Sequence, residues 1–167
     1  MRLRILQALF LVALALRVWL VFHYNPLNHL FSDPMRHWLN GERFFKPDIM
    51  GASDPLLYQV WMYGLRTLSH DNHLAIMLAT ALLSVCLPLA WYKALGELLP
   101  RSWAYAGGIL IALMPSLTMI YGYFMNETLL LPLMGAAIWL SLRAARLQRL
   151  RDFTLAALFW ALASYTR

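Results

Sequence analysis

The sequence predicts an all-α protein that crosses a membrane several times. Its residues are 61% hydrophobic and only 13% charged, whereas soluble domains are about 45–50% apolar and about 25% charged. Mean hydropathy is positive, at +0.56. Apolar stretches of helical length recur along the chain, and we expect five transmembrane helices: 5–23, 73–92, 102–120, 128–142 and 153–166. The sequence contains neither an internal repeat nor a separate soluble domain, so we interpret 1–167 as a single transmembrane domain.

The distribution of charge predicts the orientation of the chain in the membrane. With the amino terminus in the cytoplasm, the inner segments carry eight basic and two acidic residues, a net charge of +6. The outer segments carry four basic and six acidic residues, a net charge of −2. Positive charge is typical of cytoplasmic loops. The basic balance therefore reflects topology and does not indicate a nucleic-acid partner.

The first apolar stretch, 5–23, has the basic start and apolar body of a signal peptide. However, Arg17 interrupts that body and no small-residue cleavage site follows it, so we expect an uncleaved span. Arg17 lies toward the outer end of this span. Its side chain either snorkels outward to the interface or faces a cavity, where it would contact a phosphate.

The outer loop 24–72 is far too long for a simple turn and contains two Ser-Asp-Pro tripeptides, 32–34 and 53–55. Each places a capping residue beside a proline suited to the first helical turn. Apolar residues with helical spacing follow each tripeptide, which predicts two amphipathic helices in the membrane interface. Their apolar faces comprise Met35, Trp38 and Leu39 in the first, and Leu57, Val60, Trp61, Gly64, Leu65 and Leu68 in the second.

The remaining spans are joined by short connections. In the third span, Gly107, Gly108 and Pro115 allow close helix packing and a kink. The outer link after it brings Asn126 and Glu127 to the same side of the membrane as Asp33. The fifth stretch, 153–166, is shorter than the roughly 20 residues of a full span, so we expect the chain to be a fragment of a longer protein.

Asp33 is the leading candidate for a functional residue. An acid at the mouth of a membrane cavity is costly and usually functional, but an aspartate beside Pro34 also suits an N-cap. The local sequence does not separate these two roles. Asp54 has the same local pattern, and there we favour the cap. Glu127 is either a catalytic acid or an acid that the helix dipole favours in a first turn.

A metal site is a further possibility. Asp33 and His37 are four residues apart, on one face of a helix, and together with Glu127 they could ligate a metal ion. The sequence has no HExxH-like or Cys/His motif, and its single cysteine, Cys86, lies within an apolar stretch. We therefore favour a loosely held divalent ion over a catalytic transition metal. Tyr58 is an interfacial aromatic residue or a ring that stacks on a sugar.

Four features occur in a characteristic order. A span ending near Arg17 precedes an outer loop with an acid, here Asp33. The stretches DPLLYQVWMYGLRTLSHDNHLAIMLATALLS, ALMPSLTMIYGYFMNETLLLPL and ALASYTR then follow. In this order they resemble the amino-terminal part of the polytopic GT-C glycosyltransferases, and most closely the protein O-mannosyltransferases and the lipid A aminoarabinose transferases. Many of these relatives have paired acids in the first loop, where this chain has Asp33 followed by Pro34.

This resemblance implies a membrane enzyme that transfers a sugar, with inversion, from a polyprenyl-phosphate donor to an acceptor hydroxyl at the periplasmic or lumenal face. The acceptor would be a protein, a lipid or a polysaccharide, and the protein would lie in a bacterial inner membrane among its lipids. The implied site residues are Asp33 as general base, Glu127 as a second catalytic residue, Arg17 and Arg167 at the donor phosphate, and His37, Asp54, Tyr58 and Asn126 around the substrate.

Two other kinds of protein fit the composition: a non-catalytic or truncated membrane subunit, and a fragment of a transporter. A transporter would place its polar residues at mid-bilayer, on broken helices. In this sequence the polar residues gather at one interface, which favours interfacial chemistry and hence the enzyme.

Overall fold

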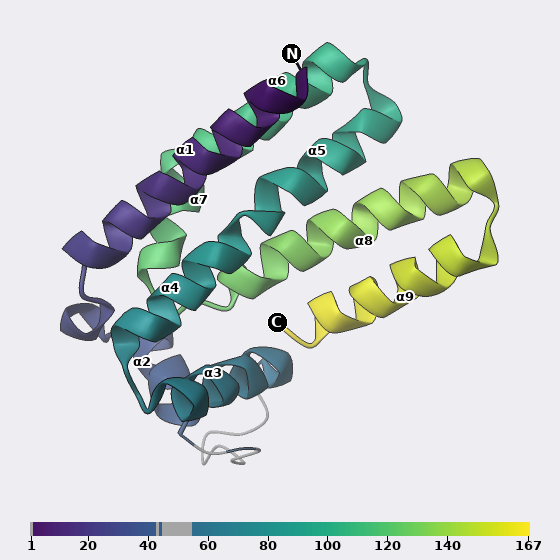
Figure 1. The fold of residues 1–167 in the computed structure, drawn as a ribbon. Helices are drawn as coiled ribbons and strands as arrows, with labels where there is room; N and C mark the ends of the chain where they lie inside the picture. Colours follow the sequence, from purple (N-terminus) through teal and green to yellow (C-terminus); the bar gives the residue numbers. More distant parts are fainter. Residues whose placement is uncertain (1, 43, 45–54) are drawn as a thin grey trace.

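The computed structural model describes residues 2–42, 44 and 55–167 and most of their side chains. Every regular element in these residues is helical, which confirms the predicted all-α class. The elements are α1 (Arg2–His23), η1 (Pro26–His29), α2 (Ser32–Asn40), α3 (Leu56–Ser69), α4 (His73–Ser84), α5 (Cys86–Leu98), α6 (Arg101–Leu113), α7 (Pro115–Met119), η2 (Ile120–Gly122), α8 (Glu127–Leu147) and α9 (Leu150–Ser164). Figure 1 shows the amino terminus and the α5–α6 and α8–α9 connections at one end of the bundle, and α2, α3 and the carboxyl terminus toward the other.

Two helices in the described residues are long and apolar enough to cross a membrane. They are His73–Leu98, which comprises α4 and α5, and α8. A third span is possible if α6 is taken together with α7 and η2, although this pair is bent by 51°. The described apolar part of α1, Phe10–His23, is shorter, and α9 has 15 residues. The chain is thus an all-α membrane protein, while the count of five spans stays a prediction.

The bend in the third span occurs at the expected proline. Pro115 has no amide hydrogen and cannot continue the ladder of α6, and Met114 before it has an extended backbone. Arg17 of α1 donates from Nη1 to the Ala112 carbonyl, 3.0 Å away, near the end of α6. A cation is favourable at a helix C-terminus, where carbonyls lack intrahelical partners. Arg17 is only 1% exposed, so of the two alternatives for its side chain, the one in which it snorkels outward is wrong.

A second proline is compensated by a tyrosine from another element. Pro132 lies inside α8 and cannot donate to the carbonyl of Thr128, four residues earlier. The hydroxyl of Tyr121 in η2 donates to this carbonyl at 3.2 Å. The guanidinium of Arg17 lies 5.5 Å from the centre of the Tyr121 ring. These buried contacts join α1, η2 and α8 without an unpaired carbonyl at the proline.

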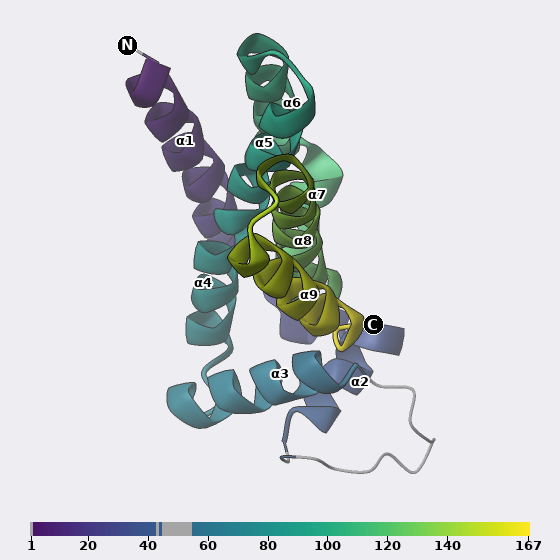
Figure 2. The same cartoon turned by 90° about the vertical axis from the view of Figure 1, so that its right-hand side faces the viewer.

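Helix α8 packs between α5 and α9, as Figures 1 and 2 show. Its close approach to α5 depends on Gly135, where a Cβ would lie 2.9 Å from ring atoms of Trp91. The helix continues to Leu147, five residues beyond the expected end of the span. This extension pairs Arg143 with Asp152 at 3.5 Å and Arg146 with Glu97 at 2.9 Å.

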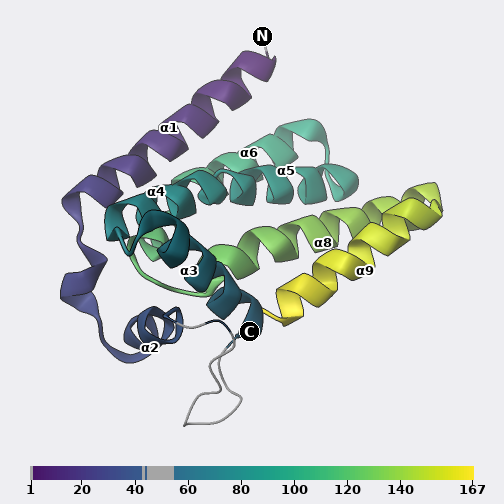
Figure 3. The same ribbon diagram turned by 60° about the horizontal axis from the view of Figure 1, so that its bottom comes forward.

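The two helices expected in the outer loop are present as α2 and α3. Helix α3 lies across the end of the bundle rather than along it (Figure 2), and α2 lies beside it (Figure 3). Met35 and Leu39 of α2 are exposed, as expected for an apolar face that contacts lipid. The helix starts differ from the prediction. The N-cap positions are Phe31 and Pro55, and neither makes a side-chain cap.

Candidate active site

Asp33 lies in the first turn of α2 and does not cap it. The N-cap position is Phe31, and Ser32, between it and Asp33, has φ = 52°. The carboxylate Oδ1 of Asp33 instead forms an ion pair with Arg36 Nη2, at 3.1 Å, and the side chain is 50% exposed. The capping alternative for Asp33 is therefore wrong, and its carboxylate faces a surface where another molecule can reach it.

A cavity of about 410 Å³ opens beside Asp33. It lies between the start of α2 and the region where α7 and η2 lead toward α8. The lining residues are Phe31, Ser32, Asp33, Pro34, Ser116, Met119, Ile120, Tyr123 and Met125. Asp33 is the one charged residue among them, and most of the others are apolar. The outer link between the third and fourth spans thus approaches Asp33, but Asn126 and Glu127 do not line this cavity.

His37 follows Asp33 by one helical turn and is buried, with 4% of its surface exposed. Its ring lies edge-on to that of Tyr58 in α3, with 4.9 Å between the ring centres. The pKa of His37 is lowered to about 4, chiefly by burial and also by the positive charge of Arg36, while Asp33 acts in the opposite direction. Tyr58 is 2% exposed and forms a hydrogen bond with the side chain of Thr128, and burial raises the pKa of its phenol. Both rings are therefore neutral near pH 7.

The buried histidine predicts that folding stability falls in mild acid. The unfolded chain protonates His37 near its ordinary pKa of 6.5, whereas the folded chain does so only near 4. Between these values the unfolded state binds more protons, so we expect stability to decrease as the pH falls from 6.5 to 4. Above pH 6.5 His37 adds no pH dependence. Thermal melting in detergent across this range measures the slope.

The control for this prediction is His37→Phe, which keeps an aromatic ring against Tyr58 but cannot titrate. We expect the decrease between pH 6.5 and 4 to be shallower in this variant. Asp33 and Arg36, the charged neighbours of His37, are unchanged, so the difference between the two curves isolates His37. Superimposable curves would contradict the assignment of a buried, neutral imidazole.

Glu127 and Asn126 lie at the start of α8, beside the end of the chain. Glu127 occupies the first turn, and its Oε2 is buried without a hydrogen-bond partner in the described residues. Asn126 donates from Nδ2 to the Thr166 carbonyl at 2.8 Å. The amide of Leu57 donates to the Tyr165 carbonyl, also at 2.8 Å. Residues 165–166 are thus held between the starts of α3 and α8.

Arg167 follows this anchored pair, and its side chain is exposed. The carboxyl terminus lies close to the beginning of α3 in Figures 2 and 3. Of the expected site residues, Tyr58, Asn126, Glu127 and Arg167 are therefore gathered around one corner, where α3, α8 and the end of α9 meet. Asp33 and His37 belong to the adjoining helix α2. Asp54 lies outside the described residues.

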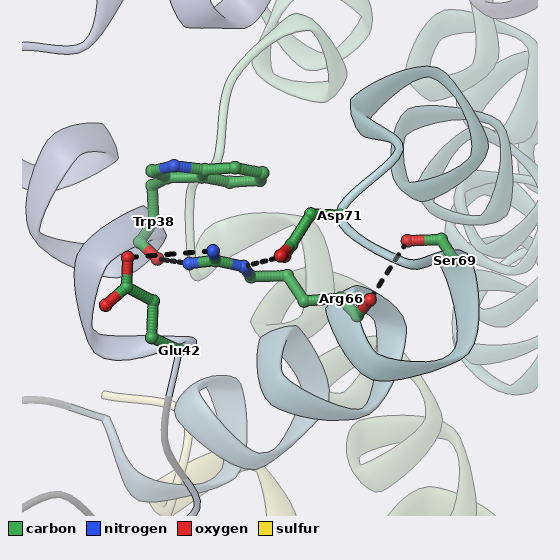
Figure 4. A network of polar contacts seen from close by, with 5 residues as sticks. All are labelled: Trp38, Glu42, Arg66, Ser69 and Asp71. Carbon is green, nitrogen blue, oxygen red and sulfur yellow. Dashed lines mark hydrogen bonds and ion pairs between the residues drawn. The ribbon is translucent and has the colours of Figure 1, made fainter.

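Arg66 of α3, a residue that the sequence did not single out, joins the elements of the outer loop. Figure 4 shows its guanidinium between α2 and the turn after α3. It donates from Nε to Asp71 at 2.6 Å and from Nη1 to the Trp38 carbonyl, and its Nη2 lies 3.7 Å from Glu42. The guanidinium also stacks 4.1 Å from the centre of the Trp38 ring. A single basic residue in a helical pattern carries no signal that distinguishes this role.

The described residues contain no group of three or more His, Cys, Asp and Glu side chains that could hold a metal ion. Asp33, His37 and Glu127 therefore do not form the shared metal site considered from the sequence. His37 is also packed against Tyr58 inside the loop.

Comparison with known proteins identifies the family. The family model of the dolichyl-phosphate-mannose-protein mannosyltransferases matches residues 53–167, more than half of the chain. The chain belongs to this family. Neither a curated protein nor a solved structure matches it. Membership in this mannosyltransferase family agrees with the resemblance to GT-C enzymes and places the chain among membrane glycosyltransferases. The match includes Tyr58, Glu127 and Arg167 but begins after Asp33, whose role it does not address.

Proposed function

We propose that this protein transfers a sugar, with inversion, from a polyprenyl-phosphate donor to an acceptor hydroxyl at the outer membrane face, with Asp33 as general base. The observation that carries this proposal is the cavity beside Asp33, in which an accessible carboxylate lies at the edge of a largely apolar lining. An enzyme that acts on a lipid-linked sugar needs a catalytic carboxylate beside an apolar surface for the lipid. The family of the chain supports the same reaction class.

The chemistry of transfer requires one base. In the reaction the acceptor hydroxyl attacks the anomeric carbon, its proton passes to the Asp33 carboxylate, and the bond from the anomeric carbon to the phosphate oxygen breaks. The ion pair with Arg36 joins Nη2 to Oδ1 of Asp33, and we assign the proton to Oδ2. Attack and departure occur on opposite faces of the sugar, so the configuration inverts.

The donor has an apolar tail and an anionic phosphate, and we assign a different surface to each. Met119, Ile120 and Met125 offer the apolar contacts for the first part of the polyprenyl chain. Arg167 is exposed, and we assign it to the phosphate, whose charge increases as the bond breaks. Arg17 is buried, but its Nε and Nη2 have no hydrogen-bond partner in the described residues. It would contact the phosphate only after the α6–α7 break has opened.

The acceptor side is assigned to the corner where α3, α8 and the end of α9 meet. Glu127 has a carboxylate oxygen without a partner, and in this proposal it orients the acceptor by taking a hydrogen bond from it. Asn126, Tyr58 and His37 hold the surrounding structure in place through the contacts described above. Asp54, outside the described residues, stays a predicted substrate residue. The family description favours mannose as the sugar and a protein hydroxyl as the acceptor.

A transporter fragment is the second candidate, because the third span is discontinuous at Met114 and broken helices build transporter sites. One assay separates the two. The purified full chain is incubated in detergent with a synthetic polyprenyl-phosphate mannose and a peptide containing serine and threonine. We expect a glycopeptide whose anomeric configuration, measured by NMR, is opposite to that of the donor.

Retention of configuration would contradict the single-displacement mechanism. Absence of any transfer from polyprenyl-phosphate sugars would contradict the proposed function as a whole and favour a non-catalytic subunit or a transporter. A donor lacking the polyprenyl chain is the matched control, and we expect it to react more slowly because it forfeits the apolar contacts at the cavity.

A further inference from the structure

A second cavity lies within the bundle, between other elements than the cavity beside Asp33. It has a volume of about 350 Å³ and runs between α5, α8 and α9; Figure 1 shows these three helices side by side. The lining residues are Leu83, Cys86, Leu89, Ala90, Lys93, Leu129, Pro132, Leu133, Ala136, Trp139 and Phe159. We call this cavity the α5–α8 groove. It shares no residue with the cavity at Asp33.

The length of the α5–α8 groove matches one leaflet of a bilayer. Along α8 its lining extends from Leu129 to Trp139, ten residues that span about 15 Å at 1.5 Å per residue. This is half of the roughly 30 Å hydrocarbon thickness of a membrane. A transmembrane helix of about 10 Å diameter lying along this length would need roughly 1,200 Å³, several times the volume of the groove. An acyl chain is the slender occupant that the volume favours.

One end of the α5–α8 groove carries a positive charge. Lys93 is the charged residue of the lining and lies five residues before the end of α5 at Leu98, while Trp139 lines the groove from α8. The neighbouring cations are paired, Arg146 with Glu97 and Arg143 with Asp152. Lys93 is exposed and has no acidic partner within the described part of the chain. A cation without an acidic partner between apolar helices is a typical environment for the headgroup of an anionic lipid.

We propose that the α5–α8 groove binds an anionic phospholipid, with one acyl chain along the groove and the headgroup phosphate on Lys93. The charge at a single end fixes the direction of the lipid, and the leaflet-length lining accommodates its chain. This site is separate from the proposed donor site, because the sugar donor is assigned to the opposite end of the bundle. The proposal holds whether or not the chain transfers a sugar.

The single cysteine of the chain provides the test. Cys86 lines the groove and is exposed, so a bound acyl chain should protect its thiol. The rate of alkylation by N-ethylmaleimide is measured for the full chain in detergent with added phosphatidylglycerol or phosphatidylcholine. We expect half-maximal protection at about fivefold lower concentration of phosphatidylglycerol, the preference that one lysine contact with an anionic lipid supplies.

Lys93→Gln should abolish the preference for phosphatidylglycerol, and Lys93→Arg should retain it. Arg149→Gln is the matched control, because Arg149 is an exposed cation near the same end that does not line the groove. Equal protection by the two lipids, or an unchanged preference in Lys93→Gln, would overturn the proposal. Stronger protection by a polyprenyl phosphate than by phosphatidylglycerol would also overturn it and would assign the groove to the donor.

Discussion

Replacing Asp33 by asparagine is expected to lower the rate of sugar transfer by about 10²- to 10⁴-fold, the usual contribution of a general base. The asparagine has a similar shape but cannot take the proton of the acceptor hydroxyl. The protein should remain folded, because Asp33 caps no helix and loses only a half-exposed ion pair with Arg36, worth about 0–1 kcal/mol. Initial rates with a radiolabelled donor, together with a melting curve, measure both effects.

Glu42→Gln is the matched control for this experiment. It removes a carboxylate from the same loop, but Glu42 does not line the cavity at Asp33. Its carboxylate lies 3.7 Å from Nη2 of Arg66. We expect its transfer rate to stay within about twofold of the unmodified chain, since no proton transfer in the proposed mechanism depends on it. Near-normal turnover of Asp33→Asn would exclude Asp33 as the base.

Replacing Arg66 by alanine is expected to reduce the free energy of unfolding by about 3 kcal/mol. The substitution removes charge-assisted hydrogen bonds to Asp71 and the Trp38 carbonyl, each of which contributes about 1.5–3 kcal/mol when buried. It also removes the cation–π contact with Trp38, worth about 0.5–2 kcal/mol. Asp71 is 60% exposed, so solvent screens its ion pair with Arg66 and reduces the contribution of this pair to the free energy of unfolding. Unfolding in detergent, followed by near-ultraviolet circular dichroism, measures the change.

Two further variants separate the geometry of Arg66 from its charge. Arg66→Lys keeps the charge, but lysine has no planar fork with which to reach several acceptors. We therefore expect it to reduce the free energy of unfolding, but by less than Arg66→Ala does. Asp71→Asn keeps the other contacts of Arg66 and should cost less than Arg66→Ala. If Arg66→Ala changed the free energy of unfolding by under about 0.5 kcal/mol, the value typical of an ordinary surface position, the network in Figure 4 would not hold the loop together.

The elements that depend on local pattern could be predicted from the sequence. Helical spacing of apolar residues indicated α2 and α3, because one face of each must avoid water. Pro115 indicated the bend in the third span, because a proline removes a backbone donor wherever it stands. Asp33 is different. A Ser-Asp-Pro sequence favours a cap, but the N-cap position is Phe31 and the aspartate lies in the first turn, after a serine with a left-handed backbone.

The features that sequence reasoning missed all depend on partners far along the chain. The carbonyl that Arg17 contacts belongs to Ala112, and nothing near residue 17 marks it. Arg66 joins α3 to α2 because α2, which lies 26 to 34 residues earlier in the sequence, brings the Trp38 carbonyl within its reach. Local patterns specify where a helix forms, whereas the tertiary fold decides which carbonyl an arginine meets. Candidate site residues could therefore be named from the sequence, but their neighbours could not.

The hydrogen bond from Tyr121 to the Thr128 carbonyl has a consequence for how this chain can vary. A residue with an amide at position 132 would supply the bond that Pro132 cannot, and the tyrosine hydroxyl would then become dispensable. While Pro132 is present, phenylalanine at position 121 would leave a carbonyl unpaired inside the bundle. Positions 121 and 132 are therefore not independent. The order in which they are substituted determines whether the Thr128 carbonyl stays paired at every step.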